Sequence, residues 1–198
     1  MTTALNANQP LFCPECGQKS FLSNDRHRYA CGSCGFTYYH NVAATASVIM
    51  RCRDEILFSV RGRHPAKGKL DFPGGFVDPN ESLEQALTRE IQEELAWRPD
   101  TEPRYLFSYP NTYDYANVTY ETTDAFFLLD VETKPTLHPQ DDVAALQWRV
   151  LKSVSDEMLA FASMRSSVNM LREIYAGHRS FTWVHVPNRP QHPQEREL

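Results

Sequence analysis

The chain has 198 residues and a mass of 22.8 kDa, which suits one ordinary domain with a small accessory module and excludes two full enzyme domains. Hydrophobic residues make up 41% and charged residues 23% of the chain, which excludes wholesale disorder. The net charge of −5 disfavours a strongly negative partner such as duplex DNA, although a local basic patch can still hold phosphates.

Residues 1–10 are expected to form a loose arm. They hold no basic segment followed by an apolar run, so we expect no secretory signal. The longest mostly apolar run, residues 42–50, is about half the length that a membrane span needs. These features predict a soluble, cytoplasmic protein that does not bind membranes.

Residues 11–40 are dense in cysteine, glycine and aromatic residues. Four of the five cysteines form two C-x2-C pairs, Cys13 with Cys16 and Cys31 with Cys34. Thiols stay reduced in a chain without an export signal, and two such turns can surround one tetrahedral ion, so the pattern predicts a structural zinc site. Cys52 has no partner pair and is expected to be a small apolar residue.

This cysteine segment resembles a zinc ribbon. It could contact nucleic acid or protein, or it could be a metal staple for a module too small to bury much surface. Between Cys13 and His40 there are three basic and two acidic residues, which is not the charge pattern of a nucleic-acid surface. This balance favours the staple.

Strands and helices of ordinary length are expected from residue 41 to residue 180. Ser82 and Gln85 match a capping box at the start of a helix that should end after Trp97, before Pro99. Gly177 is a candidate C-cap, and the tail 187–198 is expected to be disordered. The expected strands are 42–51, 55–61, 70–77, 105–109, 118–131 and 143–150, followed by one or two helices within 154–175.

Three glutamates share one side of the helix that begins at Ser82. At 100° per residue, Glu90, Glu93 and Glu94 fall within an arc of about 100°, which borders the apolar stripe of Leu87, Ile91 and Leu95. Such like charges repel unless a cation compensates them, and Mg²⁺ or Mn²⁺ prefers oxygen ligands. The alternative is a solvated acidic face, which suffices for Glu84. The preceding Gly74 and Gly75 favour the metal site, because a Gly-Gly turn lets backbone approach a ligand closely.

The residues around this helix resemble the Nudix box, Gly-x5-Glu-x7-Arg-Glu-U-x-Glu-Glu-x-Gly-U, where U is bulky and apolar. One defined position differs, because Ala96 replaces the second glycine, and we expect it to lengthen the last helical turn. The resemblance extends loosely over residues 42–176 and implies an α+β fold, a Nudix α/β/α sandwich with a mixed sheet behind the four-cysteine ribbon. The matching residues are Gly75, Glu81, Arg89, Glu90, Ile91, Glu93, Glu94 and Trp97.

The resemblance implies roles for these residues in hydrolysis of a pyrophosphate bond. Glu93 and Glu94 would be the principal magnesium or manganese ligands, joined by the Gly75 carbonyl. Glu90 would be a further ligand or the base that deprotonates water. Glu81 would act near the metal through water, and Arg89 would hold a glutamate by a charge-assisted bond.

Several basic residues precede the Gly-Gly turn, and Arg63 and Lys67 are nearest to it in sequence. We expect these two, with Gly74 and Gly75, to meet substrate phosphates, although surface charges are the ordinary alternative. Asp141 and Asp142 lie in a loop that could assist the metal site; surface acids are the more ordinary explanation.

The order of ribbon and box resembles the NADH pyrophosphatase group. Its later signature shares only a serine and a proline with residues 107–116, and Pro110, Tyr113 and Tyr115 match markers of both ADP-ribose and dinucleoside polyphosphate hydrolases. Tyr113 is a candidate to stack on a base. The expected substrate is therefore NADH, ADP-ribose or a related dinucleotide, cleaved to a nucleoside monophosphate.

Two alternatives remain at this point. The chain could be a nucleotide-sensing regulator or nucleic-acid-binding protein with a non-catalytic Nudix domain, or it could remove a dinucleotide cap from RNA. The intact acidic box argues against the first, and the near-neutral ribbon gives little support to the second. A homodimer is expected from the family resemblance alone.

Overall fold

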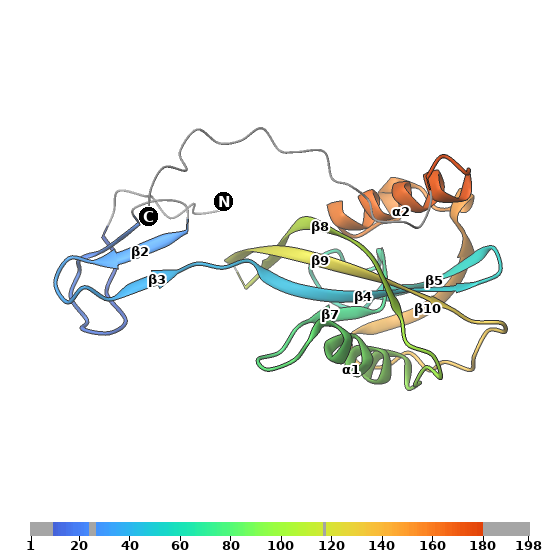
Figure 1. Ribbon diagram of the computed structural model, residues 1–198, viewed down its shortest axis with the longest axis horizontal. Helices are drawn as coiled ribbons and strands as arrows, with labels where there is room; N and C mark the ends of the chain where they lie inside the picture. The colour runs from blue at the N-terminus through green and yellow to red at the C-terminus, as the bar shows by residue number, and fades with distance from the viewer. Residues whose placement is uncertain (1–9, 24–26, 117, 180–198) are drawn as a thin grey trace.

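The computed structural model describes residues 10–23, 27–116 and 118–179, so most of the expected arm and all of the expected tail lie outside it. A small three-stranded sheet precedes a larger domain (Figure 1). The small sheet contains β1 (Phe21–Ser23), β2 (Arg28–Cys31) and β3 (Thr37–Tyr39). The larger domain contains β4 (Ala43–Cys52), β5 (Glu55–Arg61), β6 (Leu70–Asp71), β7 (Gly74–Phe76), α1 (Leu83–Leu95), β8 (Arg104–Tyr115), β9 (Val118–Asp130), β10 (Val143–Val150), the 3-10 turns η1 (Leu151–Ser153) and η2 (Asp156–Met158), and α2 (Ala162–Tyr175).

Most expected elements are present, and β5 and β10 have the expected bounds. The single strand expected over residues 70–77 is wrong. It divides at Phe72-Pro73 into β6, which pairs with β5, and β7, which pairs with β4. Proline has no backbone N–H to give to a ladder, so the chain changes partner there. The expected strand 105–109 is too short, because β8 continues to Tyr115 in a long hairpin with β9.

The large sheet is mixed and has an opening near its centre. Its strand order is β10-β5-β4-β9-β8, with β4 parallel to β9 and its other pairs antiparallel. Strands β4 and β5 pair only beside their own turn, at Arg51↔Ile56 and Cys52↔Glu55, and then diverge. The short strands β6 and β7 line the two sides of the gap between them.

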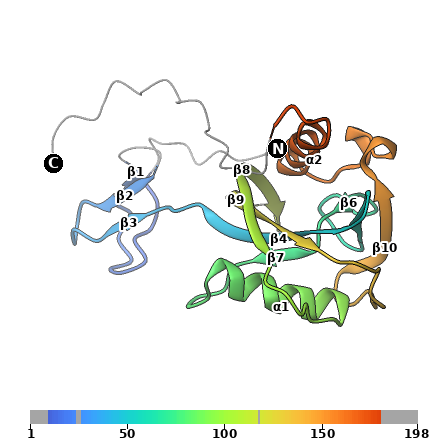
Figure 2. The ribbon, with the colours of Figure 1, turned by 45° about the vertical axis from the view of Figure 1, so that its right-hand side comes forward.

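The two long helices cover opposite faces of this sheet (Figure 2). Alternate residues of β4 separate two cores: Val48 packs with Leu87 and Ile91 of α1, whereas Ile49 packs in the core that contains Leu171 of α2. This is the period-two alternation of a strand buried on both faces. The expected α/β/α sandwich of the α+β class is confirmed.

Helix α1 begins as its sequence indicates but ends earlier. The Ser82 hydroxyl accepts the N–H of Gln85, and the Gln85 side chain accepts the N–H of Ser82, so the capping box is confirmed. We expected Ala96 to lengthen the last helical turn, and this expectation is wrong. Ala96 is the C-cap in the left-handed region with φ 50°, the conformation that a glycine adopts without strain. At the end of α2, Ala176 is the C-cap and Gly177 follows it with φ 74°.

Within the described residues, no helix is both long and apolar enough to cross a membrane.

Candidate active site and metal centre

The four paired cysteines converge at one end of the small sheet. Their sulfur atoms all lie within 4.8 Å of one another, with 3.8 Å between Cys13 and Cys34 and 3.7 Å between Cys16 and Cys31. Four thiolates at about 2.3 Å from a tetrahedral zinc ion are separated by about 3.8 Å. The cluster therefore fits a closed, four-thiolate zinc site.

The chain around this cluster favours the thiolate form at Cys31, whereas burial and the neighbouring sulfurs raise the pKa of Cys34. Gly17 and Gly35 have positive φ values, 71° and 77°, and their N–H groups donate to the carbonyls of Cys13 and Cys31. The Ser20 hydroxyl lies 3.2 Å from the Cys31 sulfur and, together with backbone N–H groups, lowers the pKa of this thiol to about 6. Stabilised thiolate is the form that binds a metal. Cys52, in contrast, is buried in β4 away from this cluster.

A cavity of about 270 Å³ occupies the opening between β4 and β5. Glu90 and Glu94 of α1 line one wall, and Ser163 of α2 lies at another. Gly74, Gly75 and Tyr113, which the sequence indicated for substrate binding, also line it. The divergence of two strands thus gives both helices access to one cavity.

Glu94 is the most buried acid of α1, with an exposure of 6%. Its Oε2 accepts the Gly74 N–H at 2.9 Å. Burial raises the pKa of Glu94 to about 9, and the carboxylates of Glu90, Asp142 and Asp71 add to the shift. A cation bound beside this carboxyl would offset both the cost of a buried negative charge and the repulsion by the neighbouring carboxylates.

Glu90 shares the cavity wall with Glu94 and faces the Gly-Gly turn. A Cβ on Gly75 would lie 2.4 Å from Glu90 Oε1, and a Cβ on Gly74 would lie 2.2 Å from the Ala46 carbonyl. Larger side chains at either glycine would therefore displace the carboxylate or the strand. Burial also raises the pKa of Glu90, against the opposing effect of Arg89.

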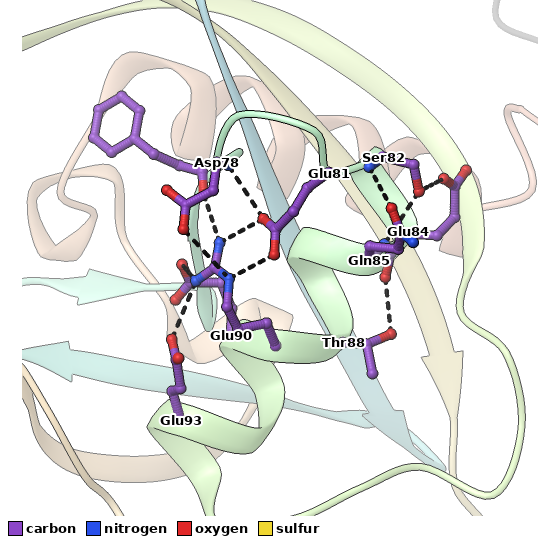
Figure 3. A network of polar contacts seen from close by, with 10 residues as sticks. Asp78, Glu81, Ser82, Glu84, Gln85, Thr88, Glu90 and Glu93 are labelled. Carbon is purple, nitrogen blue, oxygen red and sulfur yellow. Dashed lines mark hydrogen bonds and ion pairs between the residues drawn. The ribbon is translucent and has the colours of Figure 1, made fainter.

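Arg89 connects the remaining box residues, of which Glu81, Glu90 and Glu93 are labelled in Figure 3. Its Nε and Nη2 donate to the two oxygens of Glu81, each at 2.9 Å. Its Nη1 donates to Glu90 at 2.6 Å and to Glu93 at 3.1 Å. Arg89 thus holds three glutamates, where the sequence indicated one. Glu93 is half exposed and lies outside the cavity lining, directed toward this guanidinium.

The loop before β10 closes another side of the cavity. Asp141 and Asp142 both line it, and Arg63 binds them at 2.7 and 3.1 Å. Arg63 therefore pairs with these acids and is absent from the cavity lining, as is Lys67, which borders a separate shallow depression. The structure does not place these two cations at the site where we expected phosphates.

Several cavity residues were not singled out by the sequence reasoning, among them Arg61, Asp71 and Asp124. A signal was available for the two aspartates. Asp71 directly precedes the Phe-Pro-Gly-Gly turn, and Asp124 directly precedes the apolar end of β9. The inward position of Arg61, among the several basic residues that precede the Gly-Gly turn, depends instead on where β5 diverges from β4.

The donor set of this cavity fits a hard divalent ion. Carboxylates and the Gly75 carbonyl are oxygen donors of the kind that Mg²⁺ and Mn²⁺ prefer. Among the described residues, no second group of three or more ligand side chains converges as closely as the cysteines do. Mg²⁺ does not require closely converging side chains, because it keeps several water ligands and its coordination is completed by substrate phosphates.

Comparison with known proteins agrees with this geometry. A family model described as NUDIX domain matches residues 40–168, and one described as Ribosomal protein S27a matches residues 9–40. The NAD-capped RNA hydrolases NudC of Vibrio parahaemolyticus and Vibrio vulnificus are 34% and 33% identical over 83 and 99 residues, which are 42% and 50% of this chain. These matches span about a third of each relative, 32% and 37%.

Two solved structures show the same fold. A NUDIX hydrolase from Nitrosomonas europaea covers 84% of this chain and 93% of its own, with a TM-score of 0.57 and 22% identity. The NUDIX domain of NrtR from Shewanella oneidensis, solved with ADP ribose, covers 69% of this chain and 90% of its own, with a TM-score of 0.56 and 23% identity.

Proposed function

Because this chain belongs to the NUDIX family, we propose that it is a Nudix pyrophosphatase that hydrolyses the pyrophosphate bond of a nucleoside diphosphate linked to another group. The observation that carries the proposal is Glu94, a buried carboxyl beside the Gly-Gly turn that faces the cavity with Glu90. Such a group is costly to ionise without a cation, which is the expected property of a metal ligand in a metal-free state.

The proposed roles follow the positions of the side chains. Bound Mg²⁺ or Mn²⁺ would screen the phosphate charge and lower the pKa of water. Glu94 would hold it with the Gly75 carbonyl, and Glu90 would be a further ligand or the base. Glu93, which lies outside the cavity lining, would be a ligand as the family resemblance implies. Glu81 and Arg89 would orient Glu90 and Glu93, as the clamp of hydrogen bonds indicates.

The proposed substrates are NADH, ADP-ribose or a related dinucleotide. The names of the matched relatives refer to NAD-capped RNA, and the NrtR domain was solved with ADP ribose, which supports a dinucleotide or sugar nucleotide. The test is incubation of the purified chain with NADH and ADP-ribose, with and without Mg²⁺, and product identification by mass. We expect a nucleoside monophosphate only with the metal; nucleotide binding without products would indicate a sensor.

Removal of a dinucleotide cap from RNA is a second candidate. It is favoured by the names of the relatives and by the aromatic side chains that the ribbon exposes, Phe12, Tyr38 and Tyr39. Exposed aromatics can stack on single-stranded bases. NAD-capped RNA and free NAD should be compared at equal concentration. A higher kcat/KM for the capped RNA that falls in Tyr38→Ala and Tyr39→Ala, with free NAD unaffected, would support this candidate.

The proposal also includes a homodimer, as the family resemblance implies, and a cytoplasmic location. Sedimentation of the purified protein and cell fractionation would test these two points.

A further inference from the structure

The cavity that Glu90 and Glu94 line also holds a second set of charged groups. Asp71 of β6 and Asp124 of β9 line it together with Arg61 of β5. The side chains of Arg61 and Asp71 are only 13% and 17% exposed, and Asp124 is 8% exposed. These groups have no part in the proposed hydrolysis, yet buried charges are retained only where they are paired or used.

Arg61 is held by its neighbours and has little freedom to bind phosphate. Its Nη1 donates to Asp71 at 3.0 Å, and its Nε donates to the Pro65 carbonyl at 2.8 Å. Its guanidinium lies 4.9 Å from the ring centroid of Phe161 and 5.9 Å from that of Tyr113. With one guanidinium against two carboxylates, this region does not attract a further anion.

The two carboxylates retain capacity to accept hydrogen bonds. Asp71 accepts the Phe72 N–H on one oxygen and Arg61 on the other, so each oxygen keeps a lone pair. Asp124 accepts the hydroxyls of Thr45 and Thr122 on Oδ1 and that of Ser163 on Oδ2, which leaves Oδ2 able to accept again. These contacts fix both carboxylates beside the cavity.

A half-buried aromatic wall stands next to these acceptors. The rings of Tyr113 and Phe161 are 5.7 Å apart, and both line the cavity. Aromatic faces favour planar groups, and carboxylates favour N–H donors over carbonyls or anions. The combination selects a planar, uncharged heterocycle that bears an amine or a primary amide.

We infer that the region of the cavity lined by Asp71 and Asp124 recognises the N–H₂ group of the base that the substrate carries. The two carboxylates are the acceptors that determine specificity. The inference rests on the proposed function, since it places the diphosphate at the α1 acids and the base across the cavity. Two sources offer the same chemistry, the exocyclic amine of adenine and the carboxamide of nicotinamide.

Matched substrate pairs test the inference and separate the two sources. One pair is ADP-ribose and IDP-ribose, in which a carbonyl replaces the adenine amine. The other is NADH and its reduced nicotinic acid analogue, in which a carboxylate replaces the amide. The analogue leaves a buried acceptor unpaired or places an anion against it. For the pair whose base enters the cavity, the kcat/KM of the analogue should therefore be about 10- to 100-fold lower than that of the substrate with the N–H₂ group. Values within twofold for both pairs would overturn the inference.

Variants connect the discrimination to the two aspartates. In Asp71→Asn and Asp124→Asn the new amide N–H₂ can donate to a carbonyl oxygen, so the ratio within the discriminating pair should fall toward one. Asp114→Asn is the control, because Asp114 is exposed on β8 and binds Thr119 outside the cavity. A ratio that stays unchanged in both folded cavity variants would also overturn the inference. If neither variant folds, the substrate ratios of the unaltered protein decide.

Failure of the proposed function would be recognised separately. If no nucleotide is cleaved, that proposal fails, and the same pairs are compared by isothermal titration calorimetry in Mg²⁺. Tenfold weaker binding of either analogue would then retain the recognition site, and equal affinities within both pairs would reject it. Cleavage of all four nucleotides at equal kcat/KM would keep the hydrolase and reject the recognition site.

Discussion

The N–H of Gly74 donates to Oε2 of Glu94 at 2.9 Å, across twenty residues of chain. This bond fixes a buried carboxyl of α1 against the turn between β6 and β7. It orients the carboxyl, but a neutral N–H group does not supply the full positive charge that would stabilise a buried carboxylate. The relationship therefore explains both why the acid is ordered and why it should bind a cation.

Glu94→Gln should lower kcat by about 10³-fold or more, since it removes a charged metal ligand while its amide oxygen can still accept the Gly74 N–H. The melting temperature of the metal-free protein should not fall. Activity with saturating Mg²⁺ and thermal unfolding by circular dichroism check the two parts. Glu84→Gln, on the same helix but outside the cavity, is the control. Unchanged turnover in Glu94→Gln would remove the proposed metal role.

Metal-free stability should fall as pH rises. The pKa of Glu94 is about 9 and that of Asp71 about 6 in the fold, against ordinary values of 4.5 and 3.8, so the folded state holds more protons than the unfolded state between these values. The stabilisation is complete below the lower values and is lost as pH rises through about 6 and then about 9. Melting temperatures from pH 5 to 9 in a chelator should decline, and less steeply in Glu94→Gln.

Mg²⁺ should reverse this decline. Since an ion takes the place of the proton on Glu94, its effect on the melting temperature should grow between pH 6 and pH 9. If Mg²⁺ raised the melting temperature by the same amount at both pH values, or by the same amount in Glu94→Gln as in the unaltered protein, this assignment would be contradicted.

Arg89→Lys should weaken Mg²⁺-dependent activity by about 10- to 100-fold, because lysine cannot make the paired hydrogen bonds to Glu81 and also reach Glu90 and Glu93. The measurement is the Mg²⁺ concentration for half-maximal rate together with kcat. Arg98→Lys, whose guanidinium donates to the Gln92 side chain outside the Arg89 clamp, should leave both unchanged. A normal metal requirement in Arg89→Lys would show that the clamp is not needed.

Ala96→Gly should stabilise the protein by about 1 kcal/mol, since glycine adopts φ 50° without the strain of a Cβ. For a domain of this size, the melting temperature should rise by about 2–4 °C. Ala86→Gly is the matched control: Ala86 is buried within α1, so the same exchange should lower the melting temperature. A decrease in Ala96→Gly would contradict the assigned cap.

The ribbon should hold about one zinc ion per chain, measured by plasma mass spectrometry. Cys31→Ser should reduce this content and unfold the ribbon, because three thiolates no longer close the site. If the ribbon is a staple only, hydrolysis of small nucleotides should persist in this variant. Loss of that activity would show that the ribbon contributes to the catalytic domain.

The sequence by itself determined the local features of this protein. Paired cysteines, the capping box at Ser82 and the spacing of Glu90, Glu93 and Glu94 follow from short-range geometry, which repeats every two residues in a strand and every 3.6 in a helix. These features sufficed for the helix α1 and, through their resemblance to known families, for the ribbon, the sandwich and the NUDIX family. Tertiary structure decided what depends on residues distant in sequence. The divergence of β4 from β5 turns Arg61, Asp71 and Asp124 inward, and the loop before β10 takes Arg63 away from the cavity. No local period encodes these outcomes, because each depends on where a strand exchanges one hydrogen-bonded partner for another.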